Sequence, residues 1–127
     1  MTAGLDGRRV LIVEDESLVA MLLETILEDM GCQPVGPAST VEEGLAMAGD
    51  ESALDAALLD VNVAGQQIFP VAHLLRARGV PFVFSTGYGE GGLPDEWRGQ
   101  ATIQKPFTEA AIRDALMKAM GCCVSVV

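Results

Sequence analysis

Long apolar runs are missing from this chain. No stretch approaches the roughly 18 apolar residues that a membrane-spanning helix needs. The amino terminus carries acidic residues where a secretion signal needs an apolar stretch. We therefore expect a cytoplasmic protein.

Basic side chains are few. Eight lysines and arginines stand against 18 acidic residues, which gives a formal net charge of −10. Nucleic-acid phosphates must be neutralised by Lys and Arg, so this balance argues against direct binding to nucleic acid. Magnesium ions and basic surfaces of other proteins stay compatible with it.

Cysteines are also scarce, and their positions are Cys32, Cys122 and Cys123. They have no metal-ligand spacing, their number is odd, and adjacent cysteines pair poorly. The sequence therefore predicts neither a disulfide framework nor a cysteine metal site, and we expect Cys32 to lie in the core.

What the chain does contain is a regular alternation of short apolar runs with segments whose apolar residues recur every three or four positions. Its 127 residues, half of them hydrophobic, predict one domain with a core over about residues 8–120 and short tails. Short apolar runs predict strands at 8–13, 33–36, 55–59, 80–84 and 101–104. Apolar residues at steps of three and four predict helices that start at Ser17, Thr40, Phe69, Pro94 and Thr108.

Start and stop signals support these helices. Thr40 with Glu43 forms a capping box, Thr108 is an N-cap, and Gly31 suits a left-handed C-cap. The glycine-rich stretch 87–92 predicts a mobile segment and a fourth helix shortened to about residues 94–98. Strands separated by helices predict an α/β fold, a five-stranded parallel sheet with helices on both faces.

Polar residues follow the strands where each one ends. Glu14 and Asp15 follow the first strand, Asp60 the third, Thr86 the fourth and Lys105 the fifth. Because ligands of open parallel sheets bind outside the carboxyl ends of the strands, we expect these side chains to meet at one edge.

That set of groups predicts a particular chemistry. Clustered carboxylates raise one another's pKa unless a cation neutralises them, and an all-oxygen cluster suits Mg²⁺. With Mg²⁺ present, Asp60 could attack a phosphoryl group. Lys105 would pair with Asp60 or with a phosphoryl oxygen, and Thr86 would supply a hydroxyl donor.

The chain resembles the receiver domains of two-component response regulators. The resemblance covers about 120 residues and depends on four segments, which are residues 10–16, 58–62, 86–87 and 105–107. It implies a flavodoxin-like strand order 2-1-3-4-5. It also implies that Asp60 accepts a phosphoryl group from a histidine kinase or a histidine phosphotransfer protein.

The resemblance further implies the roles of the neighbouring residues. Asp15 would ligate Mg²⁺ directly, Glu14 through water, and Asn62 through its backbone carbonyl. Thr86 and Lys105 would hold the phosphoryl oxygens, and the Lys105–Pro106 bond would be cis.

A narrower similarity lies at residues 81–88, Pro-Phe-Val-Phe-Ser-Thr-Gly-Tyr. This run resembles the PFxFATGY motif of a subgroup of stand-alone receivers, with Ser85 in place of the alanine. The subgroup is associated with bacterial kinases of the HWE and related classes, and its fourth helix tends to be short or disordered.

Other positions depart from the family pattern. Thr102 stands where receivers commonly carry an aromatic switch residue, and Val63-Ala64 replaces the usual Met-Pro. Tyr88 could take over part of the switch role, shield the acyl phosphate, or simply pack. His73, the only histidine, is expected on a helix surface, and Trp97 is expected to pack the short fourth helix.

The leading interpretation is a single-domain response regulator that is not an enzyme. It would signal through a phosphorylation-dependent protein surface or drain phosphoryl groups as a sink. A phosphatase of the haloacid-dehalogenase type would need an acid at the position of Asn62. A pseudo-receiver that binds partners without phosphorylation is the other alternative, and the intact acidic, threonine and lysine positions count against it.

Overall fold

The main sheet has five parallel strands. The computed structural model describes residues 5–50, 53–86, 93–97, 99–105 and 107–121. Within them the sheet order is β2-β1-β3-β6-β7. The strands are β1 (Arg9–Val13), β2 (Gln33–Ala38), β3 (Ala56–Asp60), β6 (Phe82–Thr86) and β7 (Thr102–Gln104). Since β6 and β7 are the fourth and fifth strands of this sheet, the predicted order 2-1-3-4-5 is confirmed.

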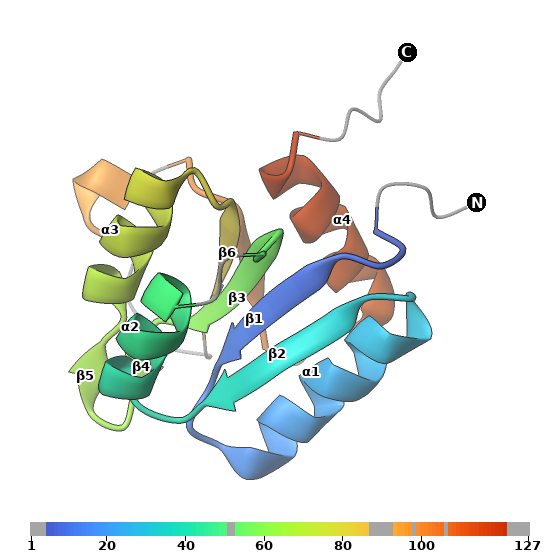
Figure 1. The fold of residues 1–127 in the computed structure, drawn as a ribbon, viewed down its shortest axis with the longest axis horizontal. Coiled ribbons are helices and arrows are strands. Elements are labelled where there is room, and N and C mark those ends of the chain that lie inside the picture. The colour runs from blue at the N-terminus through green and yellow to red at the C-terminus, as the bar shows by residue number, and fades with distance from the viewer. Residues whose placement is uncertain (1–4, 51–52, 87–92, 98, 106, 122–127) are drawn as a thin grey trace.

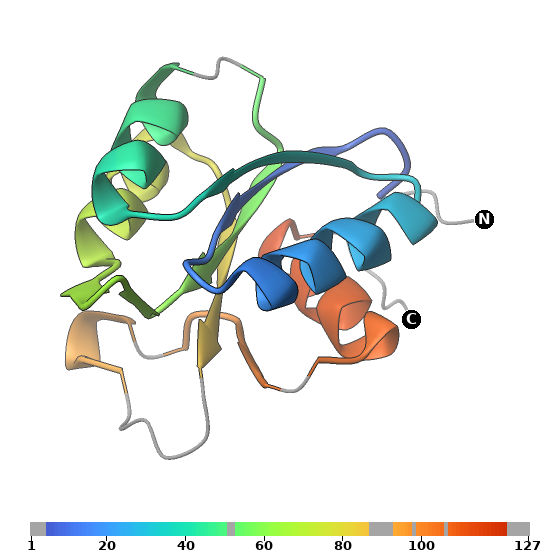
Figure 2. The same cartoon turned by 90° about the horizontal axis from the view of Figure 1, so that it is seen from below.

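Two helices cover each face of the sheet (Figures 1 and 2). On one face lie α1 (Ser17–Asp29) and α4 (Glu109–Ala119), and on the other lie α2 (Val41–Asp50) and α3 (Phe69–Arg78). No helix among the described residues is both long and apolar enough to cross a membrane.

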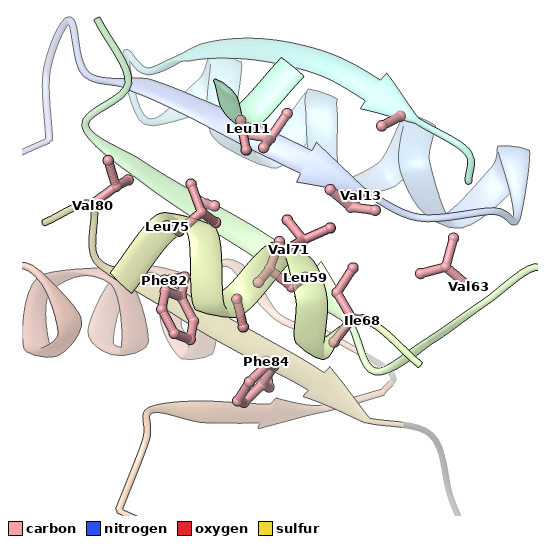
Figure 3. Close-up of a cluster of buried hydrophobic side chains, with 14 of the residues drawn as sticks. Leu11, Val13, Leu59, Val63, Ile68, Val71, Leu75, Val80, Phe82 and Phe84 are labelled. Carbon is pink, nitrogen blue, oxygen red and sulfur yellow. The ribbon is translucent and has the colours of Figure 1, made fainter. Parts of the chain in front are cut away.

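The strands feed two separate hydrophobic cores, because successive side chains of a strand point to opposite faces. Leu11 and Leu59 point into the core under α2 and α3, whereas Ile12 and Leu58 point into the core under α1 and α4. Figure 3 shows the first core, in which side chains of β1, β3 and β6 meet those of α3. Burial on both faces makes β3 the centre of the sheet, with all five of its residues buried.

Local capping follows the predicted chemistry. The Thr40 hydroxyl accepts a hydrogen bond from the Glu43 amide at 3.0 Å, and the Thr108 hydroxyl accepts one from the Ala111 amide at 3.1 Å. The Glu43 carboxylate reaches the Ser39 amide at 2.8 Å, one residue before the predicted N-cap. Gly79 ends α3 in the left-handed conformation with φ 75°.

Several boundaries differ from the prediction by one or two residues. Strand β2 runs two residues further, to Ala38, and α2 continues past Gly49, while β7 begins only at Thr102. Cys32 is buried, as expected.

The exposed side of α1 was not predicted. Leu22 belongs to the apolar steps of three and four that predict this helix, yet its side chain is 43% exposed. The reason is that α1 carries more apolar residues than one helical face can bury.

The segment after Asp60, for which the sequence pattern predicts neither a strand nor a helix, forms a small antiparallel hairpin. Its strands are β4 (Asn62–Val63) and β5 (Gln66–Gln67). The two turn residues, Ala64 with φ 51° and Gly65 with φ 82°, both have left-handed backbone. The predicted short fourth helix is a single 3-10 turn, η1 (Asp95–Trp97). The predicted mobile stretch 87–92 lies outside the described residues.

Candidate functional site

Three carboxylates meet where β1 and β3 end. Glu14 and Asp15 come directly after β1, and Asp60 is the last residue of β3. These two strands are neighbours, with Val13 opposite Leu59, so their ends lie side by side. One carboxylate oxygen from each of the three residues lies within 4.8 Å of the others. Glu14 and Asp60 are buried, whereas Asp15 is exposed.

Lys105 brings a positive charge into this cluster from β7. Its Nζ lies 3.4 Å from Glu14 Oε1 and 3.4 Å from Asp60 Oδ2. The Lys105 amide donates a hydrogen bond to the Thr86 carbonyl at 2.9 Å, which fixes the residue beside the end of β6. The predicted pairing of Lys105 with Asp60 is therefore present.

Burial and crowding shift the pKa values of these groups. Burial, with the nearby Asp60 carboxylate, raises the pKa of Glu14 from 4.5 to about 7. Burial also raises the pKa of Asp60, although the Lys105 ammonium opposes the shift. Burial disfavours the charge on Lys105, but Asp60 and Glu14 outweigh it and raise the pKa of Lys105. The cluster holds more negative charge than one ammonium neutralises.

The fit of this cluster to a divalent cation can be judged from its atoms. Among the described residues Glu14 Oε1 is a buried oxygen that accepts no hydrogen bond, although the Lys105 ammonium lies 3.4 Å away. A buried acceptor without a hydrogen bond is rare in folded proteins. All the grouped ligand atoms are carboxylate oxygens, the donors that Mg²⁺ prefers. The residues present therefore fit Mg²⁺.

The backbone after Asp60 contributes two further contacts. The Asn62 amide lies 3.4 Å from Asp60 Oδ1 and donates a hydrogen bond to it. The Ala64 amide donates a hydrogen bond to Asp15 Oδ2 at 3.0 Å, so the hairpin β4–β5 holds the exposed carboxylate of the cluster. Asn62, the residue whose carbonyl we expected to face a metal ion, begins this hairpin.

Thr86 ends β6 at the same edge. Its neighbour Ser85 is paired with Asp60 in the sheet register, so Thr86 lies one residue beyond the strand partner of Asp60. Thr86 is partly exposed and Ser85 is buried. The strand ends thus bring Glu14, Asp15, Asp60, Thr86 and Lys105 to one edge of the sheet, as the sequence predicted.

Other predicted positions lie away from this edge or outside the described residues. Thr102 is exposed on β7, and its hydroxyl donates to the Gln100 carbonyl at 3.0 Å. His73 is exposed on α3, as expected, and Trp97 is buried. Tyr88, Pro106 and the pair Cys122-Cys123 lie outside the described residues, so the roles and the cis bond predicted for them stay predictions.

Two contacts of the site were missed by sequence reasoning. Glu16 Oε1 lies 3.8 Å from Lys105 Nζ, and a third acid directly after Glu14-Asp15 was the available signal for it. The Ala64 amide contact had no side-chain signal, because any residue except proline carries that donor.

Known proteins similar to this chain share one domain family. A family model described as the response regulator receiver domain matches residues 10–117. The phyllosphere-induced regulator PhyR of Methylorubrum extorquens is 33% identical over 114 residues, which are 87% of this chain and 43% of PhyR. The chain thus spans less than half of that curated relative.

Solved structures agree with this likeness. The solution structure of SdrG from Sphingomonas melonis Fr1 is 43% identical, with a TM-score of 0.81 over 90% of this chain and 96% of SdrG. A solution structure of the BeF3-activated conformation of SdrG, from Pseudomonas melonis Fr1, is also 43% identical, with a TM-score of 0.75 over 88% of this chain and 95% of that one.

Proposed function

The chain belongs to the response regulator receiver family, and from this premise we propose that it is a phosphoryl-accepting signalling switch with Asp60 as the acceptor. The observation that carries the proposal is the convergence of Lys105 with Glu14 and Asp60 at the strand ends. The donor would be a histidine kinase or a histidine phosphotransfer protein in the cytoplasm. The chain itself would be the substrate of that transfer and not an enzyme.

The chemistry proposed for the chain's own residues is as follows. An Asp60 carboxylate oxygen forms a bond to phosphorus while the bond between phosphorus and the donor's histidine nitrogen breaks. Lys105, already 3.4 Å from Asp60 Oδ2, stays beside the new acyl phosphate and pairs with a phosphoryl oxygen. The Thr86 hydroxyl donates to another of these oxygens.

Mg²⁺ would be held by Asp15, Asp60 and the Asn62 carbonyl, with Glu14 acting through water. When bound, it supplies positive charge that offsets the charge of the phosphoryl group and the carboxylates. Glu14 Oε1 supports this assignment, because it is buried and accepts no hydrogen bond, its charge being met only by the Lys105 ammonium 3.4 Å away.

The protein donor would dock on α1. The large hydrophobic side chains exposed among the described residues are Leu18, Met21 and Leu22, at 80%, 58% and 43% exposure. All three lie on α1, which begins at Ser17, two residues after Asp15. An exposed apolar patch beside a reactive site suits the docking of a protein that must reach that site.

The solved structures of SdrG support the same proposal. SdrG has a conformation described as BeF3-activated, and beryllofluoride is an analogue of an aspartyl phosphoryl group. PhyR extends well beyond the part that this chain matches, so its partners are not carried over. The output of this chain would be a changed affinity for a downstream protein, or, in a sink, no output at all.

Phosphorylation can be tested with a small phosphodonor. Incubation of the chain with acetyl phosphate and Mg²⁺ should add the mass of one phosphoryl group in intact mass spectrometry. Asp60→Asn should show no such addition, and chelation of Mg²⁺ should abolish it in the natural chain. A natural chain that stays unmodified under these conditions would contradict the proposal and favour a phosphorylation-independent binding module.

A further inference from the structure

Trp97, the only tryptophan of the chain, anchors the 3-10 turn η1. Its side chain is 1% exposed. The ring stacks on Phe69 of α3 at 5.9 Å between centroids, and it meets Phe82 and Phe84 of β6 edge-on at 5.8 and 5.5 Å. A turn of three residues has little stability of its own, so these ring contacts hold η1 on the domain.

Polar groups close over the outer side of this ring. The Arg76 guanidinium lies 4.0 Å from the Trp97 ring centroid, and the His73 ring meets it edge-on at 5.0 Å. Glu96 Oε2 lies 3.5 Å from His73 Nε2 and 3.8 Å from Arg76 Nη1. Arg76 Nη2 also donates to the Glu96 carbonyl at 3.4 Å. We call these four residues, His73, Arg76, Glu96 and Trp97, the Trp97 clasp; its turn is the orange segment beside α3 in Figure 1.

The strand beneath the clasp is the strand that ends at the candidate site. Phe82, Phe84 and Thr86 are alternate residues of β6, so they lie on the same face of the sheet. Phe82 and Phe84 pack against the Trp97 ring. Thr86 ends the strand beside Asp60, and its carbonyl accepts a hydrogen bond from the Lys105 amide. One strand therefore joins the clasp to the phosphoryl-accepting edge.

The neighbouring strand offers no equivalent aromatic connection. Thr102 of β7 lies opposite Phe84 in the register, and its exposed side chain is polar. The aromatic contacts of β6 instead run to η1 and α3. The aromatic side chains of β6, the strand that ends at the site, therefore pack against Trp97 of η1 and Phe69 of α3.

We propose that the Trp97 clasp is the device that couples Asp60 to the protein surface, an inference that rests on the proposed function. The closed clasp coexists with the Lys105–Asp60 ion pair. A phosphoryl group on Asp60 replaces that pair and draws Thr86 toward its oxygens. The clasp, through the contacts of Trp97 with Phe82 and Phe84, holds β6 in the position seen in this structure. Phosphorylation and clasp closure therefore oppose each other.

Linkage gives this proposal a measurable consequence. If phosphorylation loosens the clasp, then loosening the clasp by mutation must raise the affinity for a phosphoryl analogue by the same coupling factor. Arg76→Gln removes the guanidinium over the ring, and Glu96→Gln removes the carboxylate that contacts both His73 and Arg76. We expect each variant to bind beryllofluoride about two- to fivefold more tightly in the presence of Mg²⁺, the range of an exposed cation–π contact.

The two variants control for net charge because they change it in opposite directions. A general electrostatic effect on the anionic analogue would weaken binding in one variant and strengthen it in the other. Arg78→Gln is the matched control on the same helix, since Arg78 bonds to the Ala48 carbonyl of α2 and is not part of the clasp. Arg78→Gln should leave the beryllofluoride affinity unchanged, whereas Arg76→Gln should raise it.

The readout is amide and indole NMR with Trp97 fluorescence, and dispersed amide spectra confirm that each variant is folded. The inference predicts that the Trp97 indole signal shifts at saturating beryllofluoride. It is overturned if that signal stays fixed while the Lys105 amide shifts, or if Arg76→Gln and Glu96→Gln bind like Arg78→Gln. If the natural chain binds no beryllofluoride at all, the proposed function itself fails.

Discussion

The buried carboxylates of Glu14 and Asp60 share one positive charge, the Lys105 ammonium. Because both carboxylates are buried, the stability of the folded chain depends on pH. The Lys105 ammonium lies 3.4 Å from an oxygen of each. In isolation such a buried pair of carboxylates is costly to ionise, which is why burial raises both pKa values. The ionised forms of these two carboxylates are therefore destabilised by burial, and a bound divalent cation would stabilise them.

The first prediction concerns stability against pH in Mg²⁺-free buffer. The Glu14 pKa is about 7 in the folded chain against an ordinary 4.5, so the folded chain binds more protons between these values. The stability that Glu14 contributes is then complete below pH 4.5 and is lost as the pH rises through 7. Denaturant unfolding should show a loss of up to about 3 kcal/mol from this group.

Glu14→Gln isolates that contribution. The variant should be more stable than the natural chain at pH 8, and the difference should shrink toward pH 5. Glu28→Gln on the exposed side of α1 is the matched control. A stability difference for Glu14→Gln that does not change with pH would contradict the assignment.

The second prediction concerns Ala64 in the hairpin turn. Left-handed backbone at φ 51° costs a residue with a side chain about 1–2 kcal/mol, and turns of this kind favour glycine or asparagine. Ala64→Gly keeps the amide that bonds Asp15 and should raise the unfolding free energy by about 0.5–1 kcal/mol, after the backbone entropy of glycine is subtracted.

Ala46→Gly, at an exposed position inside α2, serves as the opposite case. There glycine brings only its entropy cost and should lower stability by about 0.5–1 kcal/mol. Thermal unfolding of both variants measures the contrast. Equal losses in the two variants would mean that the turn at Ala64 is not left-handed in solution.

Among the elements, helix α1 has apolar side chains on both its buried side and its exposed side. Its buried side packs Leu23 and Leu27 against the sheet, while Leu18 and Met21 face away from it. The third prediction is that Leu18→Gln slows phosphotransfer from a histidine phosphotransfer protein by about tenfold, the effect of losing one buried apolar contact in a complex.

The same variant should react with acetyl phosphate at the natural rate, because a small donor needs no docking surface. Thr25→Gln, exposed further along the same helix, is the control and should change neither rate. The rates follow from the fraction of phosphorylated chain over time. A parallel loss with both donors would place the defect in the site and not in docking.

Elements whose ends carry a chemical signal were predictable from the sequence. Thr40 and Thr108 supply capping groups where α2 and α4 begin, and Gly31 has the left-handed backbone, at φ 85°, just after α1 ends. The hairpin after Asp60 was not predicted, because Ala64 is a poor turn residue by composition. The single turn η1 is held by ring contacts from α3 and β6, which no local pattern reveals.

At the scale of the whole molecule, sheet topology builds the site. Glu14, Asp60 and Lys105 are far apart in the sequence, but each follows or ends a strand of one parallel sheet. That rule was enough to predict their meeting. The finer contacts, such as the Ala64 amide on Asp15, depend on backbone geometry and could be found only in the structure.

The proposed function requires first that the Asp60 cluster binds Mg²⁺ and then a phosphoryl group. The most direct test is two-dimensional amide NMR of the full chain, titrated first with Mg²⁺ and then with beryllofluoride, beside Asp60→Asn. The proposed function predicts saturable shifts at Asn62 and Ala64 with Mg²⁺, and further shifts at Thr86 and Lys105 with beryllofluoride that Asp60→Asn does not show. Spectra of the natural chain that stay unchanged through both titrations would contradict it.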